Sequence, residues 1–175
     1  IPHPRLEVIL TTGEEVGLIG ATGIDVSMCK GRRMINLDSE DEGVFLAGCA
    51  GGASVAVSLP VQRAEMEGQL CEITVTGLIG GHSGTEINKG RANSNVLLGI
   101  TLDHLVQHCG ISLVSFAGGD KDNAIPRESR AEILIKPDEK QAFYAALEEY
   151  RQKIKAVFGQ ADPGIKVSVE EKAEG

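Results

Sequence analysis

The sequence Gln69-Leu-Cys-Glu-Ile-Thr-Val-Thr76 alternates apolar and polar side chains and is followed directly by Gly77. A period of two is typical of a strand that has one face on a core and the other toward solvent. Residues 111–117 and 129–135 are further short apolar stretches, and residues 165–169 alternate again. We therefore expect four strands in this part of the chain.

Two segments between these strands have the spacing of amphipathic helices. Residues 88–108 carry apolar side chains every three or four positions, and Gly110 is positioned to end that helix. Asp138 can cap a second helix that runs to about residue 158. The resulting order, β-α-β-β-α-β over residues 69–170, predicts an α+β, ferredoxin-like arrangement with two helices on one face of an antiparallel sheet.

Upstream of this region the pattern is that of a parallel α/β sheet. Leu6–Thr12 and Arg33–Leu37 are short apolar runs that predict buried strands, and residues 15–24 predict a short helix between them. So short a segment cannot complete a sheet, and we expect its other strands to lie outside this chain. The small-residue stretch Ala47–Ser54 predicts a hinge, and residues 55–61 alternate as a strand.

Charge and composition exclude several classes of function. Lys and Arg total 17 against 25 Asp and Glu, a net charge of −8, and no basic cluster is interleaved with aromatic residues, which argues against nucleic-acid binding. No apolar run approaches the length of about 18 residues that a membrane-spanning helix needs. Four cysteines without a C-x-x-C pair are typical of reduced thiols, so we expect a cytoplasmic protein.

Acidic residues follow both predicted upstream strands. Glu14 and Glu15 come after the first strand, and Asp38 comes after the second. Carboxyl ends of parallel strands share the crevice in which open α/β sheets bind ligands, so one carboxylate can bind a metal while a neighbour acts as base on metal-bound water. Alternatively, the Glu pair opens a helix whose dipole favours acids, and Asp38 belongs to a solvated turn. Zinc also requires His or Cys, so most of its ligands would come from outside this chain.

The sequence Gly80-Gly-His-Ser-Gly84 presents one imidazole and one hydroxyl between glycines. Glycine lets the backbone come close to a ligand, which favours a functional role for His82. Ser83 is a poor nucleophile candidate because Thr85 breaks the G-x-S-x-G pattern.

Residues 118–127 form a long connection between two predicted strands, and connections of this length commonly carry function. Asn123 can donate a hydrogen bond to an oxyanion or a carboxylate. Arg127 can pair with an acid or simply provide a charge at the rim.

His104 and His108 have i, i+4 helical spacing. Leu105 stands where the H-E-x-x-H zinc motif requires Glu, so the pair is expected to lie near a helix C-terminus, favoured by its dipole.

Five motifs, taken together and in this order, resemble one family: T-T-G-E-E-V-G at 11–17, N-L-D-S-E at 36–40, G-C-A-G-G at 48–52, G-G-H-S-G at 80–84 and N-A-I-P-R at 123–127. They are similar to motifs of the aminoacyl-histidine (Xaa-His, carnosinase-like) dipeptidases, relatives of the co-catalytic zinc aminoacylases and carboxypeptidases. The resemblance implies a role for each matching residue. Glu14 would be the general base and His82 would polarise the scissile carbonyl. Glu15 and Asp38 would each bind one of two zinc ions, and Asn123 would contact the substrate.

The resemblance also implies an architecture and an activity. Residues 1–46 would be part of a catalytic domain, and residues 47–175 a lid domain that forms a homodimer. The parent would be a cytoplasmic enzyme that cleaves Xaa-His dipeptides with two zinc ions or other divalent metals. The family's H-x-D histidine, bridging aspartate and C-terminal histidine are not in this sequence, so we expect an internal fragment that is inactive alone. The alternatives are a related tripeptidase, carboxypeptidase or deacylase, or a non-catalytic ferredoxin-like dimerisation module.

Overall fold

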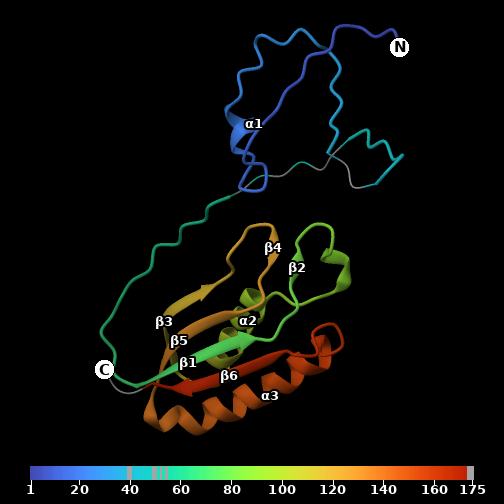
Figure 1. The fold of residues 1–175 in the computed structure, drawn as a ribbon. Helices are drawn as coiled ribbons and strands as arrows, with labels where there is room; N and C mark the ends of the chain where they lie inside the picture. The colour runs from blue at the N-terminus through green and yellow to red at the C-terminus, as the bar shows by residue number, and fades with distance from the viewer. Residues whose placement is uncertain (39–40, 49–50, 52, 54, 173–175) are drawn as a thin grey trace. The chain divides into compact units, whose positions relative to one another are not determined.

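The computed structural model describes residues 1–38, 41–48, 51, 53 and 55–172. The chain divides into two compact units, unit 1 (Ile1–Ser58) and unit 2 (Leu59–Gly175) (Figure 1). The predicted hinge at Ala47–Ser54 lies partly outside the described residues. Among the described residues, no helix combines the length and the apolar composition that crossing a membrane requires.

Unit 2 is built on a four-stranded sheet in which every pair of neighbouring strands is antiparallel. The strand order is β3-β5-β1-β6, and the strands span Gln69–Thr76 (β1), Ile111–Gly118 (β3), Ser129–Ile135 (β5) and Lys166–Glu171 (β6). The alternation predicted for β1 is confirmed, because Cys71, Ile73 and Val75 are buried and the residues between them are not. One face of the sheet is therefore apolar and the other is polar.

Two helices pack against the apolar face, α2 (Ser94–His108) and α3 (Lys140–Phe158). The Asn93 side chain caps α2 by accepting the N–H groups of Asn95 and Val96 at 3.0 and 3.2 Å. A 3-10 turn, η2 (Pro137–Glu139), leads into α3. The side chains that are largest and fully buried come from both layers: Ile73, Val75, Leu98, Leu105, Ile133, Ile135, Phe143 and Leu147. The six long elements thus follow the order β-α-β-β-α-β.

The helix termini differ from those predicted. Helix α2 starts at Ser94 and not near residue 88, because Gly90 has a positive φ of 66° and separates it from a 3-10 turn, η1 (Ile87–Lys89). At its other end, the extended Cys109 ends the helix, so Gly110 is not its left-handed terminator. Asp138 lies within η2 and does not cap α3.

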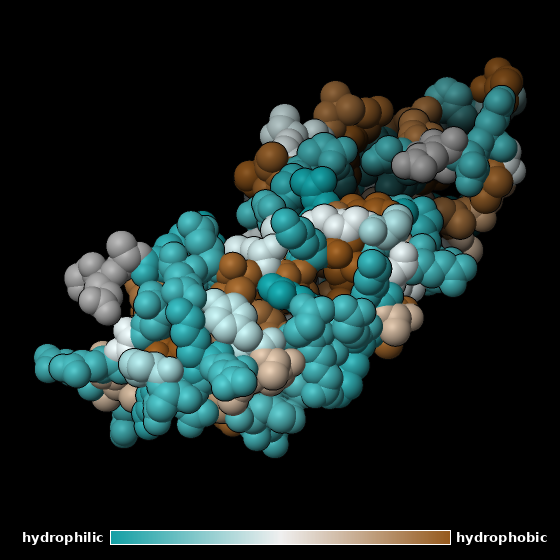
Figure 2. Space-filling model, turned by 90° about the horizontal axis from the view of Figure 1, so that it is seen from below, coloured by the Kyte–Doolittle hydropathy of each residue, from teal (hydrophilic) through white to brown (hydrophobic). Residues whose placement is uncertain are grey.

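Unit 1 lacks the strands that its apolar runs predict. The runs Leu6–Thr12 and Arg33–Leu37, and residues 55–61, form no strand, and the predicted helix shortens to α1 (Ile19–Gly23). A strand needs a neighbour for its backbone hydrogen bonds and its apolar face. No ladder forms among the described residues of unit 1, and Leu10 and Leu37 are each 88% exposed. Exposed apolar groups of this kind are visible as brown patches in Figure 2.

A buried carboxylate, that of Asp162, connects two loops of unit 2. Its two oxygens accept the backbone N–H groups of Ile79, at 2.8 Å, and Ala92, at 2.7 Å. Asp162 is fully buried, so each of these hydrogen bonds is shielded from water. The carboxylate therefore fixes the chain on both sides of the Gly80–Gly84 motif.

We predict that Asp162→Ala lowers the free energy of unfolding of unit 2 by about 2–4 kcal/mol, because it leaves two buried N–H groups without an acceptor. Asp162→Asn retains one acceptor oxygen and should cost less. Urea denaturation followed by circular dichroism measures both changes, with Asp103→Ala on the exposed surface of α2 as the control. An Asp162→Ala protein as stable as the control would contradict this role.

Candidate functional site

The two glycine-flanked motifs of unit 2 meet in a small ribbon. Strand β2 (Gly81–His82) pairs with β4 (Ala124–Ile125), which places His82 opposite Ala124 (Figure 1). The Ser83 N–H also donates to the Asn123 carbonyl at 2.9 Å. The structure thus brings together His82 and Asn123, which are distant in the sequence.

The close approach of chains in this ribbon explains its glycines. Gly80 and Gly81 have positive φ angles of 69° and 139°, which favour glycine. A Cβ at Gly81 would lie 2.6 Å from both an Arg91 nitrogen and a Glu86 oxygen. Arg127, which the sequence left between two roles, packs its side chain against Gly80. Larger residues at 80 or 81 would therefore displace the ribbon's supporting side chains.

The imidazole of His82 is exposed but held in one orientation. Its Nδ1 accepts the backbone N–H groups of Gly84, at 3.0 Å, and Thr85, at 3.2 Å. An Nδ1 that accepts hydrogen bonds carries no proton, so in the neutral ring the proton is on Nε2. His82 therefore presents an N–H donor outward, the group needed to bind a carbonyl oxygen.

Glu86 and Arg91 support the ribbon, and neither was among the sequence candidates. Glu86 Oε2 accepts the His82 backbone N–H at 2.9 Å, while its Oε1 pairs with Lys89 and lies 3.4 Å from Arg91. Arg91 also donates to the Gly80 carbonyl. The hydrogen bonds from Lys89 and His82 lower the pKa of Glu86 to about 2. The only signal in the sequence was a short cluster of opposite charges directly after the motif.

A cavity of about 870 Å³ lies beside the ribbon, over the polar face of the sheet. Its walls include Gly81, Ala124 and Ile125 of the ribbon. Charged groups of both signs line it: Glu72, Asp120, Lys121, Arg127, Glu128 and Arg130. A cavity of this size with mixed charge suits a small zwitterionic molecule.

The acidic candidates of unit 1 lie on its surface. Glu14 and Glu15 are exposed in a tight turn, in which the Glu14 carbonyl accepts the N–H groups of Gly17 and Leu18 at 3.2 and 3.0 Å. Asp38 is also exposed, and its own N–H donates to the Asn36 side chain at 3.1 Å. The turn presents both carboxylates to solvent.

The donor chemistry of these acids fits zinc, but the set is incomplete. Among the described residues, the groups of three or more potential ligands within 4.8 Å of one another number one, and it contains none of Glu14, Glu15 and Asp38. Carboxylate oxygens bind zinc, whereas zinc centres also require imidazole or thiolate. Unit 1 therefore offers candidate ligands without assembling a centre by itself.

The fold of unit 2 and its site define a peptidase lid of the dimerising type. Residues 73–162 match the family described as the peptidase dimerisation domain (M20), and the chain belongs to this family.

Two relatives extend the comparison over most of the chain. The cytosol non-specific dipeptidase of Escherichia coli K12 is 34% identical over 94% of this chain and 34% of its own length. The aminoacylhistidine dipeptidase of Vibrio alginolyticus, a crystal structure, is 28% identical with a TM-score of 0.72, again over 94% of this chain and 34% of the other. An uncharacterised Bacillus subtilis protein is 28% identical over 97% of this chain. The chain spans about a third of the length of both dipeptidases.

The pKa of Glu86 predicts how the ribbon responds to acid. Because this pKa falls from 4.5 to about 2, the stabilisation from the carboxylate is complete above about pH 4.5 and is lost as the pH falls toward 2. The backbone amide resonance of His82, measured by NMR, should therefore shift with a midpoint near pH 2. Glu86→Gln should abolish that transition. A midpoint near 4.5 in the unaltered protein would contradict the hydrogen-bond network.

Proposed function

We propose that the protein containing this chain is a metal-dependent dipeptidase that cleaves Xaa-His dipeptides. The observation that carries the proposal is the β2–β4 ribbon, in which His82 and Asn123 lie together beside a cavity of mixed charge. The family and the two dipeptidase relatives support peptide hydrolysis as the reaction. The preference for histidine rests on the family resemblance of the motifs and on the Vibrio relative.

The proposed roles divide between the two units. Glu15 and Asp38 would each contribute a ligand to one of two zinc ions, or to other divalent metals. Bound metal supplies an acidified water and charge stabilisation for the reaction. Glu14 would remove a proton from the attacking water and deliver it to the leaving amine.

In unit 2, His82 would act as the electrophilic donor. Its outward Nε2–H can hydrogen-bond the scissile carbonyl as negative charge develops on the oxygen. Asn123 would contact the same substrate, and the basic groups of the cavity would attract its carboxylate. The orientation set by Gly84 and Thr85 favours this role, because the ring does not have to change tautomer to donate.

The same proposal includes a homodimer formed by unit 2. Exposed apolar residues lie where edge strand β3 borders α2: Leu113, Phe116 and Val106 are 56%, 42% and 60% exposed. On that side of α2, Asn95 donates to the Gly118 carbonyl, and Val106 follows it by three helical turns. An apolar edge of this kind suits a second copy of the chain. We further assign unit 2 to the ferredoxin-like class, supported by its strand order, and place the protein in the cytoplasm, as the name of the Escherichia coli relative states for that enzyme.

A second candidate is a related amidohydrolase, such as a tripeptidase, carboxypeptidase or deacylase. The name of the Escherichia coli relative, a non-specific dipeptidase, favours a broader range of dipeptides. A substrate panel on the full-length protein separates these activities. A non-catalytic dimerisation module would hydrolyse none of them, and this chain alone is expected to be inactive in every case.

Catalytic roles are tested in the full-length protein. Glu14→Gln should reduce kcat at least about 100-fold with metal content unchanged, because the proton acceptor is lost. His82→Ala should reduce it by about 10²–10³-fold, again without loss of metal. If His82 serves the partner subunit's site, mixing the two inactive variants restores part of the activity. Metal loss from Glu14→Gln would mean that Glu14 is a ligand, and exchanged subunits without activity would assign His82 to its own subunit.

The dimer proposal predicts that Leu113→Asp together with Phe116→Asp converts this chain to a monomer. Burying two carboxylates in an apolar contact is costly, so the dimer should dissociate. Sedimentation equilibrium measures the association constant, and Val157→Asp on α3 is the matched control. A dimer unaffected by the β3 substitutions would place the contact elsewhere.

A further inference from the structure

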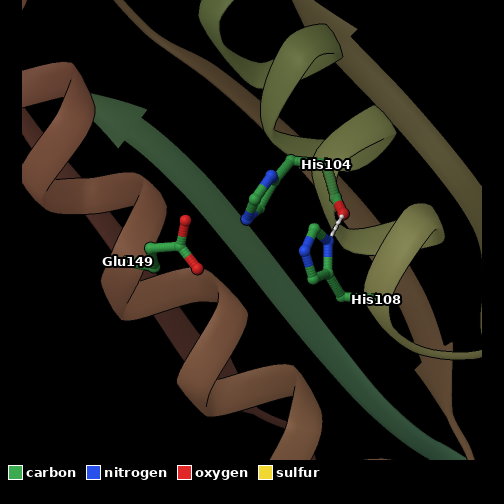
Figure 3. A group of neighbouring side chains, drawn as sticks. All are labelled: His104, His108 and Glu149. Atoms are coloured by element: carbon green, nitrogen blue, oxygen red, sulfur yellow. Dashed lines mark hydrogen bonds between the residues drawn. The ribbon is translucent and has the colours of Figure 1, made fainter.

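Two histidines of α2 and one glutamate of α3 face one another on the helical layer of unit 2. His104, His108 and Glu149 each direct a potential ligand atom toward the others, and these atoms lie within 4.8 Å of one another (Figure 3). The sequence lacks the Glu of an H-E-x-x-H motif, because Leu105 occupies that position. The tertiary structure supplies a carboxylate from the neighbouring helix.

His104 carries an unused polar atom at the centre of this group. Its Nε2 is shielded from solvent and has no hydrogen-bond partner among the described residues. The ring is held between His108, at 4.2 Å between centroids, and Tyr150, stacked at 4.9 Å. A buried nitrogen without a partner is unfavourable, and binding a metal would satisfy it.

His108 is oriented as metal-binding histidines commonly are. Its Nδ1 lies 2.8 Å from the His104 carbonyl, an acceptor that requires the proton on Nδ1. In the neutral ring, Nε2 is then free of a proton and can act as a ligand. A backbone carbonyl that fixes the tautomer of a histidine in this way is a frequent feature of zinc sites.

Glu149 supplies negative charge from α3. One of its oxygens, Oε1, pairs with Lys153 at 2.6 Å, which leaves Oε2 without a described ion pair. Lys153 lowers the pKa of this carboxyl, and His104 and His108 contribute to the shift. The C-terminal end of α2, where His108 is the last residue, adds the negative end of the helix dipole. The group therefore attracts cations from both helices.

We propose that His104, His108 and Glu149 bind a Zn²⁺ ion that links α2 to α3. Two imidazoles and one carboxylate suit zinc, and they disfavour Mg²⁺ and Ca²⁺, which prefer oxygen ligands. Tetrahedral zinc holds its ligand atoms about 3.4 Å apart, so the group must contract. His108 and Glu149 are exposed and can rotate to do so, and water completes the coordination. The bound ion would join the two helices and stabilise unit 2.

Isothermal titration calorimetry of the 175-residue chain with ZnCl₂ tests the site. We expect one zinc ion to bind with an affinity that His108→Ala and Glu149→Gln each lower at least about tenfold, since each removes a ligand. His3→Ala removes an exposed histidine of unit 1, and Glu148→Gln removes the adjacent carboxylate of α3. Both controls should retain the affinity of the unaltered chain. MgCl₂ should give no saturable heat at this site.

Two further measurements separate ligand loss from misfolding. In EDTA, His108→Ala and Glu149→Gln should melt within about 2 °C of the unaltered chain, because both side chains are exposed. Zinc should raise the melting temperature of the unaltered chain and not that of either variant. It should also shift the NMR resonances of the His104 ring and of Tyr150. Zinc affinity that survives both substitutions, or disappears with His3→Ala, would overturn the assignment.

Discussion

The arrangement of unit 2 around its site depends on one buried carboxylate. Asp162 lies beyond α3, yet it holds Ile79 before the Gly80–Gly84 motif and Ala92 just after Arg91. A charge-assisted hydrogen bond inside a protein is stronger and more directional than one on the surface. The loop that carries His82 is thereby anchored at both ends to the core, although His82 itself is exposed.

From those anchors, the site is organised by contacts that orient the backbone before any ligand arrives. Glu86 receives the His82 N–H, Arg91 reaches the Gly80 carbonyl, and the glycines permit both contacts. The imidazole then has a single neutral tautomer. An electrophilic donor needs such preorganisation, because reorientation during a reaction would cost part of the stabilisation it provides.

The helical layer illustrates a different use of histidine. His82 presents a proton outward from Nε2, whereas His108 is hydrogen-bonded through Nδ1 and leaves Nε2 as an acceptor. The same side chain is thus set up as a donor in one place and as a metal ligand in the other. Which role each takes is decided by whether its Nδ1 faces backbone N–H groups or a carbonyl oxygen.

The sequence by itself determined the elements whose signals are local. The alternation at Gln69–Thr76, the helical spacing before His108 and the conformational demands of Gly80 and Gly81 were readable because each depends on neighbouring residues. The tertiary structure decided what depends on distant partners: the pairing of His82 with Ala124, the approach of Glu149 to two histidines, and the burial of Asp162. Unit 1 shows the same limit in reverse. Its apolar runs have strand-like patterns, but a strand exists only where another backbone accepts its hydrogen bonds, and that partner cannot be read from the run itself.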